Sequence, residues 1–191
     1  VVTAIDLGRR LGLPGRASGA PTMNLVVRHS KGTSSLVVDA NEAWSEANFS
    51  ENMRACGQAD VAMIEQPLPA DADEMLRDVR RTVPICADES VHVRGDLEGL
   101  VGKYDGVNVK LDKAGGLTEA LDLVREARRR DFRIMVGCML ATSLAMAPAM
   151  LIAQEADIVD LDGPLLLARD RVPGLAYSGA LVSPPERALW G

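Results

Sequence analysis

Aromatic residues and cysteines are both scarce in this sequence. Aromatics make up 3% of the chain, so a core must be packed mainly from aliphatic side chains and methionine, within a hydrophobic fraction of 47%. The three cysteines, at positions 56, 86 and 138, form an odd and scattered set without the spacing of a disulfide framework. Reduced thiols and a cytoplasmic location are therefore expected. The length of the chain corresponds to about one domain.

The sequence also lacks any long basic run, and its formal net charge is −6. An acidic chain is a poor match for a nucleic-acid backbone, so no nucleic-acid partner is expected. Residues 134–154 carry no charge, which is long enough to suggest a membrane span. Gly137 and Pro148 interrupt this run, which divides into a buried strand at 134–138 and a buried helix at 143–153. No membrane partner is expected.

Short β-branched runs alternate with helical patterns along most of the chain. The expected strands cover residues 24–27, 36–40, 61–65, 83–87, 106–111, 134–138 and 158–161, and the expected helices cover 42–56, 71–81, 91–102, 118–130 and 143–153. This alternation predicts a parallel sheet with helices outside it. Both an open, doubly wound sheet and a β/α barrel have this order.

Charged residues end four successive strands at a regular interval. Asp39, Glu65, Asp88 and Lys110 are separated by 65−39 = 26, 88−65 = 23 and 110−88 = 22 residues, about one β/α unit each. In a barrel the carboxyl ends of all strands meet at one mouth, whereas in an open sheet they spread along an edge. The repeated polar strand ends therefore favour an α/β fold of the TIM-barrel type.

The number of strands is too small for a closed barrel. Six strands and one weaker candidate are found, whereas a closed barrel needs eight. The deficit lies before Asp39, where about 17 residues separate Pro21 from Val38, little more than one parallel crossover needs. The chain is therefore expected to be incomplete at its N-terminal strands, through truncation or through internal segments left out, with the barrel domain at residues 23–191.

The three carboxylates are the hard oxygen ligands that Mg²⁺ prefers. Each alone could equally be a helix cap or an ion-pair partner, but three at matching strand ends favour a metal site. Lys110 beside such a site could act as a base that removes a proton next to a carboxylate, with the cation offsetting the charge of the enediolate. The alternative is a lysine that only pairs with the acids. Lys113, in the following turn, is expected to be a structural partner of Asp112.

These motifs together resemble one protein family. The resemblance rests on Asp39-Ala-Asn41 with Glu42 and Trp44, Glu65-Gln-Pro67, Asp88-Glu-Ser90 and Lys110-Leu-Asp-Lys-Ala-Gly-Gly116, which look like the barrel domain of the enolase superfamily, muconate-lactonizing branch. Val136-Gly-Cys-Met139 and Asp160-Leu-Asp162 are similar to the dipeptide epimerases of the L-Ala-D/L-Glu type. The resemblance runs from about residue 36 to the C-terminus.

The resemblance implies a (β/α)7β barrel and a role for each matching residue. Asp39, Glu65 and Asp88 would bind Mg²⁺, and Lys110 would be the acid/base lysine on one face of the substrate α-carbon. Asp160 and Asp162 would hold the α-ammonium group of a dipeptide, although a turn around Gly163-Pro164 could also explain them. Residues 1–22 would be a remnant of the N-terminal capping domain and its linker, and the protein is expected to be a homo-oligomer.

Two departures from the family pattern leave alternatives open. The family's second base lies in a Lys-x-Lys strand, which this sequence lacks, and Lys31 lies only 39−31 = 8 residues before Asp39, too close for a crossover helix. The family also carries a glutamate near the end of the seventh strand, where this chain has Ala141. The alternatives are another enzyme of the branch, such as a cycloisomerase or an o-succinylbenzoate synthase, and a non-catalytic barrel fragment.

Overall fold

The structure, a computed structural model, describes residues 24–30 and 33–191, and side chains from residue 35 onward. The chain divides into two compact units. Unit 1 comprises residues 1–90 and 102–105, and unit 2 comprises residues 91–101 and 106–191. The predicted boundary at residue 22 and Lys31 both lie outside the described residues.

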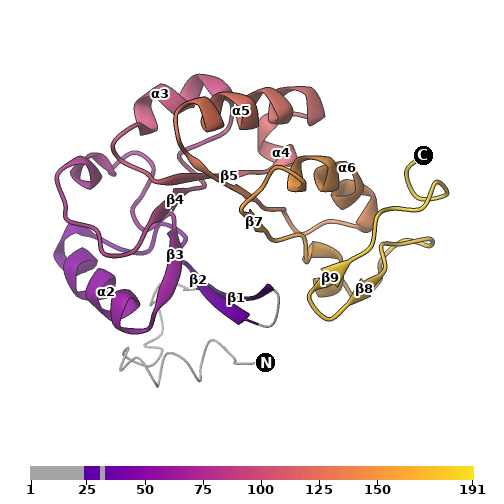
Figure 1. The fold of residues 1–191 in the computed structure, drawn as a ribbon, viewed down its shortest axis with the longest axis horizontal. Helices are drawn as coiled ribbons and strands as arrows, with labels where there is room; N and C mark the ends of the chain where they lie inside the picture. The colour runs from indigo at the N-terminus through magenta and orange to yellow at the C-terminus, as the bar shows by residue number, and fades with distance from the viewer. Residues whose placement is uncertain (1–23, 31–32) are drawn as a thin grey trace. The chain divides into compact units, whose positions relative to one another are not determined.

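Unit 1 contains four hydrogen-bonded strands (Figure 1). β1 (Asn24–Ser30) pairs antiparallel with β2 (Thr33–Asp39), whereas β2, β3 (Val61–Glu65) and β4 (Ile85–Ala87) pair in parallel. The prediction of four strands is confirmed, but the expectation of an all-parallel sheet is wrong for β1. Two residues separate β1 from β2, and so short a connection can join only antiparallel strands.

One of the two helices predicted for unit 1 is present. Helix α2 (Glu46–Gln58) begins after the predicted N-cap Ser45, whose backbone N–H donates to Asn48 Oδ1 at 2.8 Å. The helix predicted at residues 71–81 is wrong, because only a 3₁₀ turn, η1 (Glu74–Arg77), forms there. Asp73, just before η1, is 2% exposed and bonded to three distant side chains, which hold this segment away from a regular helix.

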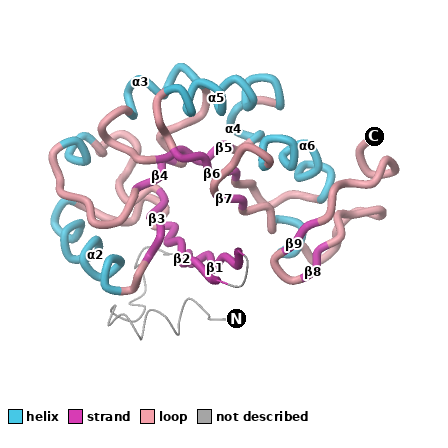
Figure 2. The backbone as a smooth tube through the Cα atoms, in the orientation of Figure 1, coloured by secondary structure: helices cyan, strands magenta, loops and turns pink. Residues whose placement is uncertain are grey.

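Unit 2 contains three parallel strands and a small hairpin. β5 (Gly106–Val109), β6 (Arg133–Val136) and β7 (Ile158–Val159) pair in parallel, and β8 (Tyr177–Ser178) pairs antiparallel with β9 (Leu181–Val182). In Figure 2, helices α5 and α6 lie on the same side of β5, β6 and β7. This is the layering expected where helices connect parallel strands.

The helices of unit 2 follow the predicted order with one shortened element. They are η2 (Arg94–Asp96), α3 (Leu97–Leu100), α4 (Leu111–Ala114), α5 (Leu117–Arg129), α6 (Ser143–Ala153) and η3 (Gly163–Leu166). The predicted helices at 118–130 and 143–153 are confirmed. The helix predicted at 91–102 is reduced to η2 and α3, because Asp96 Oδ2 accepts the N–H groups of His92 and Val93 and turns the chain there.

The core is aliphatic, as the composition predicts. Its largest fully buried side chains are Phe49, Met63, Ile64, Leu68, Leu76, Ile85, Leu97, Leu123, Ile134, Met135, Met146 and Ile152. The uncharged run at 134–154 forms β6 and α6, and none of the described helices is long and apolar enough to cross a membrane. In the described part of the chain, β2–β4 and β5–β7 supply six strands in β/α order, fewer than a closed barrel needs.

Candidate active site

The three predicted metal ligands of unit 1 lie at the carboxyl ends of neighbouring strands. Asp39 ends β2 and Glu65 ends β3, and the two residues are direct partners in the parallel ladder. Glu65 is in turn level with Cys86 of β4, two residues before Asp88. Aligned residues of parallel strands, and residues two apart in a strand, share a face of the sheet. The register therefore directs these carboxylates to one face.

The backbone hydrogen bonds between these strands continue for one residue beyond the ends of β2 and β3. Ala40 N–H donates to the carbonyl of Glu65 at 2.9 Å, and Gln66 N–H donates to the carbonyl of Cys86 at 2.9 Å. Glu65 is 4% exposed and Asp88 is 3% exposed. Carboxylates this deeply buried need compensation by hydrogen bonds or cations.

Glu89 reports an excess of negative charge at this edge of unit 1. Burial raises the pKa of its carboxyl above the ordinary value, and the charges of Asp88, Asp39 and Glu42 raise it further. Its Oε1 accepts a hydrogen bond from Asn41 Nδ2 at 3.3 Å, whereas Oε2 is buried and has no hydrogen-bond partner. A buried, unsatisfied oxygen among carboxylates fits a site for a hard cation.

The carboxylates do not form a finished coordination sphere. Within the described residues, no group of three or more His, Cys, Asp or Glu side chains stands ready to hold a metal ion. The donor chemistry and the shared strand level fit Mg²⁺, and ligation would also require the side chains to turn toward a common point.

Lys110 and Asp160 lie at the same level of the sheet in unit 2. Val109, Val136 and Val159 are aligned in β5, β6 and β7. The ladder continues one residue further, since Gly137 N–H donates to the Val109 carbonyl at 3.2 Å and Asp160 N–H donates to the Val136 carbonyl at 2.8 Å. Lys110, Gly137 and Asp160 therefore follow their strands side by side and share one face.

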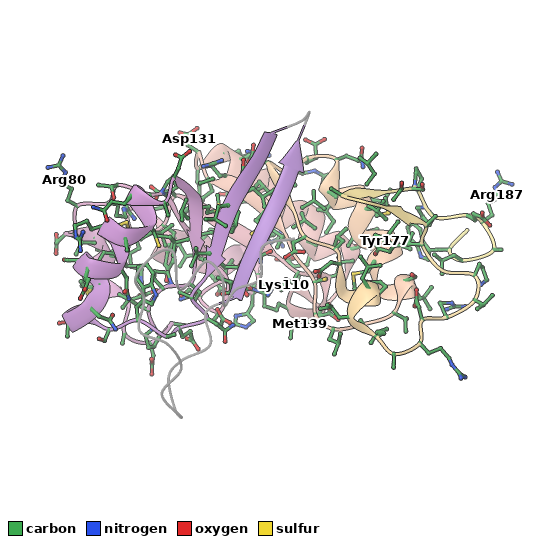
Figure 3. All side chains as sticks on the ribbon, turned by 90° about the horizontal axis from the view of Figure 1, so that it is seen from below. Arg80, Lys110, Asp131, Met139, Tyr177 and Arg187 are labelled. Atoms are coloured by element: carbon green, nitrogen blue, oxygen red, sulfur yellow. The ribbon has the colours of Figure 1, made fainter. Side chains whose placement is uncertain are left out.

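Figure 3 shows the side chains at the two ends of these strands. Lys110, after β5, and Met139, after β6, lie toward one side of the view, whereas Asp131, which precedes β6, lies toward the opposite side. The carboxyl ends of these strands thus form one edge, which carries the predicted base and the predicted ammonium-binding residues.

Gly137 separates Lys110 from Asp160 without adding a side chain. A Cβ at this position would lie 2.6 Å from Asn108 Oδ1 and 2.7 Å from Asn108 Nδ2, and Asn108 is 1% exposed. The glycine lets the Asn108 side chain pack over β6. Gly137 is part of the Val136–Met139 motif of the sequence, but its packing role was not predicted from that motif.

Cys138 is a further residue of this edge, and no role was predicted for it from the sequence. Burial raises the pKa of its thiol to about 11, the charges of Asp160 and Asp162 add to the rise, and the charge of Lys110 opposes it. The thiol is therefore protonated at neutral pH and lies within electrostatic reach of all three predicted site residues of unit 2. In the sequence, only the position of Cys138 next to Gly137 could have indicated that its side chain lies near the predicted site residues.

Asp162 lies at the start of η3, where the turn alternative also placed it. Its carbonyl accepts the N–H of Leu165 at 2.8 Å, but its carboxylate makes no capping hydrogen bond to η3. The backbone of Asp162 therefore serves the turn while its exposed carboxylate does not. Tyr177 Oη donates to the carbonyl of Leu161 at 2.7 Å and so ties the Asp160–Asp162 segment to β8.

Comparison with known proteins identifies close relatives. Residues 22–185 match the family described as Enolase C-terminal domain-like. An N-acetyl-D-glutamate racemase of Pseudoalteromonas sp is 49% identical over 83% of this chain and 50% of its own length. The L-Ala-D/L-Glu epimerase of Escherichia coli (strain K12) is 45% identical over 81% of this chain and 48% of its own length.

A solved structure supports the same relationship. It is that of an enolase family member from Agrobacterium tumefaciens with homology to dipeptide epimerases, with bound sodium and L-Ala-L-Glu. It is 55% identical, with a TM-score of 0.80 over 81% of this chain and 48% of its own. The chain thus spans about half the length of the relatives it matches. The predicted fold class, an enolase-type β/α barrel with fewer strands than the complete domain, is confirmed. The chain belongs to the family of enolase C-terminal domain-like proteins.

Proposed function

We propose that this protein takes part in the Mg²⁺-dependent epimerisation of dipeptides of the L-Ala-D/L-Glu type. The observation that carries the proposal is the carboxyl edge of unit 2, where Lys110 and Asp160 follow aligned strands and Asp162 lies two residues further on. Relatives that match 83% and 81% of this chain are named N-acetyl-D-glutamate racemase and L-Ala-D/L-Glu epimerase.

Each site residue has a distinct role in this proposal. Lys110, in its neutral form, takes the α-proton next to the substrate carboxylate from one face of the α-carbon, and in its protonated form it returns a proton to that face when the reaction starts from the other epimer. Inversion also requires a second acid/base group on the opposite face. Asp160 and Asp162 accept hydrogen bonds from the substrate's α-ammonium group. Asp39, Glu65 and Asp88 would hold Mg²⁺, which supplies positive charge against the charge that develops on the substrate carboxylate.

Racemisation of an N-acylated amino acid is the second candidate function. The relative at 49% identity is named N-acetyl-D-glutamate racemase, and such a substrate has no ammonium group. Asp160 and Asp162 favour the dipeptide, because two carboxylates would have no cationic partner on an acetylated amine. The same argument disfavours the cycloisomerase and o-succinylbenzoate synthase alternatives.

The test is a substrate panel in D₂O with the full chain and Mg²⁺. L-Ala-L-Glu, L-Ala-D-Glu and N-acetyl-D-glutamate are incubated separately, and α-proton exchange and inversion are followed by NMR. Exchange and inversion of the dipeptides support the proposal, and turnover of the acetylated substrate alone supports the second candidate. Absence of exchange with every substrate favours the non-catalytic fragment.

The proposed cytoplasmic location rests on the three cysteines, all of which are free thiols.

A further inference from the structure

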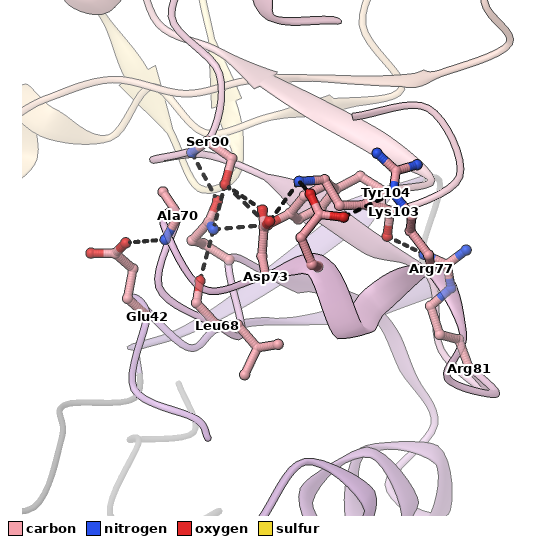
Figure 4. Close-up of polar contacts among 11 residues, drawn as sticks. Glu42, Leu68, Ala70, Asp73, Arg77, Arg81, Ser90, Lys103 and Tyr104 are labelled. Carbon is pink, nitrogen blue, oxygen red and sulfur yellow. Dashed lines mark hydrogen bonds and ion pairs between the residues drawn. The ribbon is translucent and has the colours of Figure 1, made fainter. Parts of the chain in front are cut away.

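The side-chain amide of Gln66 is fully buried in unit 1 and hydrogen-bonded on both sides. Its Oε1 accepts the backbone N–H groups of Asp88 at 2.8 Å and Ser90 at 3.2 Å. Its Nε2 contacts the Leu68 carbonyl at 2.8 Å, Ser90 Oγ at 2.9 Å and Tyr104 Oη at 2.9 Å. Figure 4 shows Leu68, Ser90 and Tyr104, the partners of Nε2, together with Asp73 and Lys103.

The orientation of this amide is determined by its partners. Backbone N–H groups can only donate and a backbone carbonyl can only accept. A flipped amide would therefore direct its NH₂ group at two donors and its oxygen at the Leu68 carbonyl. The oxygen of Gln66 is thus committed to the segment that carries Asp88.

A buried ion pair orders the hydroxyl groups on the other side of Gln66. Asp73 Oδ1 pairs with Lys103 Nζ at 2.6 Å, and the two side chains are 3% and 9% exposed. Asp73 Oδ2 accepts Tyr104 Oη at 2.7 Å and Ser90 Oγ at 3.0 Å. Because both hydroxyls donate to the carboxylate, their lone pairs are left for the NH₂ group of Gln66. The Asp73–Lys103 pair therefore determines the direction of each hydrogen bond in the network, as far as the backbone N–H of Asp88.

The backbone of Gln66 reaches the remaining strand ends. Gln66 directly follows Glu65, and its carbonyl accepts the N–H of Glu42 at 2.8 Å, three residues after Asp39. Its φ of 32° lies in the left-handed region, which residues other than glycine adopt at a cost in free energy. The chain accepts this conformation at the point where one residue contacts all three predicted ligand segments.

We infer that Gln66 is a positioning residue that sets the relative placement of Asp39, Glu65 and Asp88, with the Asp73–Lys103 pair holding its amide in the required orientation. The inference rests on the proposed function, since it gives these carboxylates the role of cation ligands. A purely structural network would stabilise unit 1 without affecting cation binding, so affinity and stability must be measured separately.

The experiment measures Mg²⁺ affinity of the full chain by calorimetry, together with the thermal midpoint. Gln66→Met keeps a similar volume and removes every side-chain hydrogen bond, and we expect Mg²⁺ to bind about 10- to 100-fold more weakly, as for other residues that orient metal ligands. Tyr104→Phe removes one hydroxyl and should weaken binding in the same direction. It also serves as the test if Gln66→Met does not fold.

Ser143→Ala is the matched control. Ser143 is a buried serine of unit 2 that, like Ser90, is bonded to an aspartate, here Asp170. Its loss should lower the thermal midpoint and leave the Mg²⁺ dissociation constant unchanged. Ser90→Ala, in contrast, should weaken Mg²⁺ binding.

Amide exchange in the metal-free protein gives a second reading. The Asp88 and Ser90 amides should exchange at least about tenfold faster in Gln66→Met than in Ser143→Ala, because their acceptor is lost. Unchanged exchange, or an unchanged dissociation constant in Gln66→Met while the unaltered chain binds Mg²⁺, would overturn the inference. Failure of the unaltered chain to bind Mg²⁺ would instead overturn the proposed metal site, and with it the role of Gln66 toward the ion.

Discussion

Lys110 is the residue on which the proposed proton transfer depends most directly. It follows β5 in extended conformation and is the residue before α4, so the backbone that carries it is anchored on both sides. A side chain whose backbone lies between a strand and a helix starts from a fixed position, which favours repeated proton transfer at one place.

Lys110→Ala should reduce epimerisation of L-Ala-L-Glu by about 10²- to 10⁴-fold or more, because a positioned base is lost. If a second base serves the other face of the α-carbon, deuterium exchange of one enantiomer only should survive, as measured by NMR in D₂O. Lys113→Ala, three residues along in α4, is the control and should retain activity. Unchanged epimerisation in Lys110→Ala would leave Lys110 as a structural counter-ion.

Asp162 tests which substrate class the site accepts. Asp162→Asn removes the charge of an exposed carboxylate that makes no capping bond to η3. We expect kcat/KM for dipeptides to fall by about 10- to 100-fold, the value of one hydrogen bond to a charged group, with Mg²⁺ affinity unchanged. Asp122→Asn, in a surface ion pair with Arg125, is the control. Equal use of N-acetylated and free dipeptides by the unaltered chain would refute the ammonium-binding role.

At the scale of elements, helix α6 depends on a residue far from it in sequence. Asp170 Oδ1 accepts the N–H of Ser143, the first residue of α6, at 2.9 Å, and Asp170 Oδ2 accepts the Ser143 hydroxyl. Burial opposes ionisation, but the bonds from Ser143 outweigh it and hold the pKa of Asp170 below its ordinary value of 3.8. Asp170 thus supplies the charged acceptor that the helix start lacks locally.

Asp170→Asn keeps an oxygen acceptor but removes the negative charge, and it should lower the free energy of unfolding by about 0.3 to 1 kcal/mol at pH 7, the typical value of a negative charge at the start of a helix. A depressed pKa means that this contribution is complete above pH 3.8 and is lost as the pH falls through the folded-state value. Denaturant titrations should therefore show the two proteins converging below about pH 4. Asp131→Asn, an exposed position with φ of 62° that asparagine tolerates, is the control. A pH-independent difference would contradict the assignment.

The proposed cation should stabilise the molecule as a whole. An ion that binds only the folded chain adds about 2.7 kcal/mol at a concentration 100 times its dissociation constant. We expect Mg²⁺ to raise the thermal unfolding midpoint, whereas KCl of equal ionic strength should not. The increment should be smaller in Asp88→Asn. An equal rise with both salts would indicate screening among the carboxylates around Glu89 in place of specific binding.

The sequence by itself determined the order of elements and the chemistry at their ends. Apolar runs of the right period produce strands and helices from local contacts, so β3 and α6 have the predicted bounds. The common position of charged residues at strand ends, such as Lys110 and Asp160, could be predicted because every parallel sheet brings the carboxyl ends of its strands to one edge.

Only the tertiary structure decided the features that depend on contacts between distant segments. Residues 71–81 have a helical pattern, yet the burial of Asp73 against Lys103 and Tyr104 replaces the helix by a 3₁₀ turn. Gln66 is part of a motif in the sequence, but the hydrogen bonds of its amide to Asp88 and Tyr104 exist only in the folded chain. The physical reason is that a buried polar group is specified by its partners, and those partners lie up to 38 positions away along the chain.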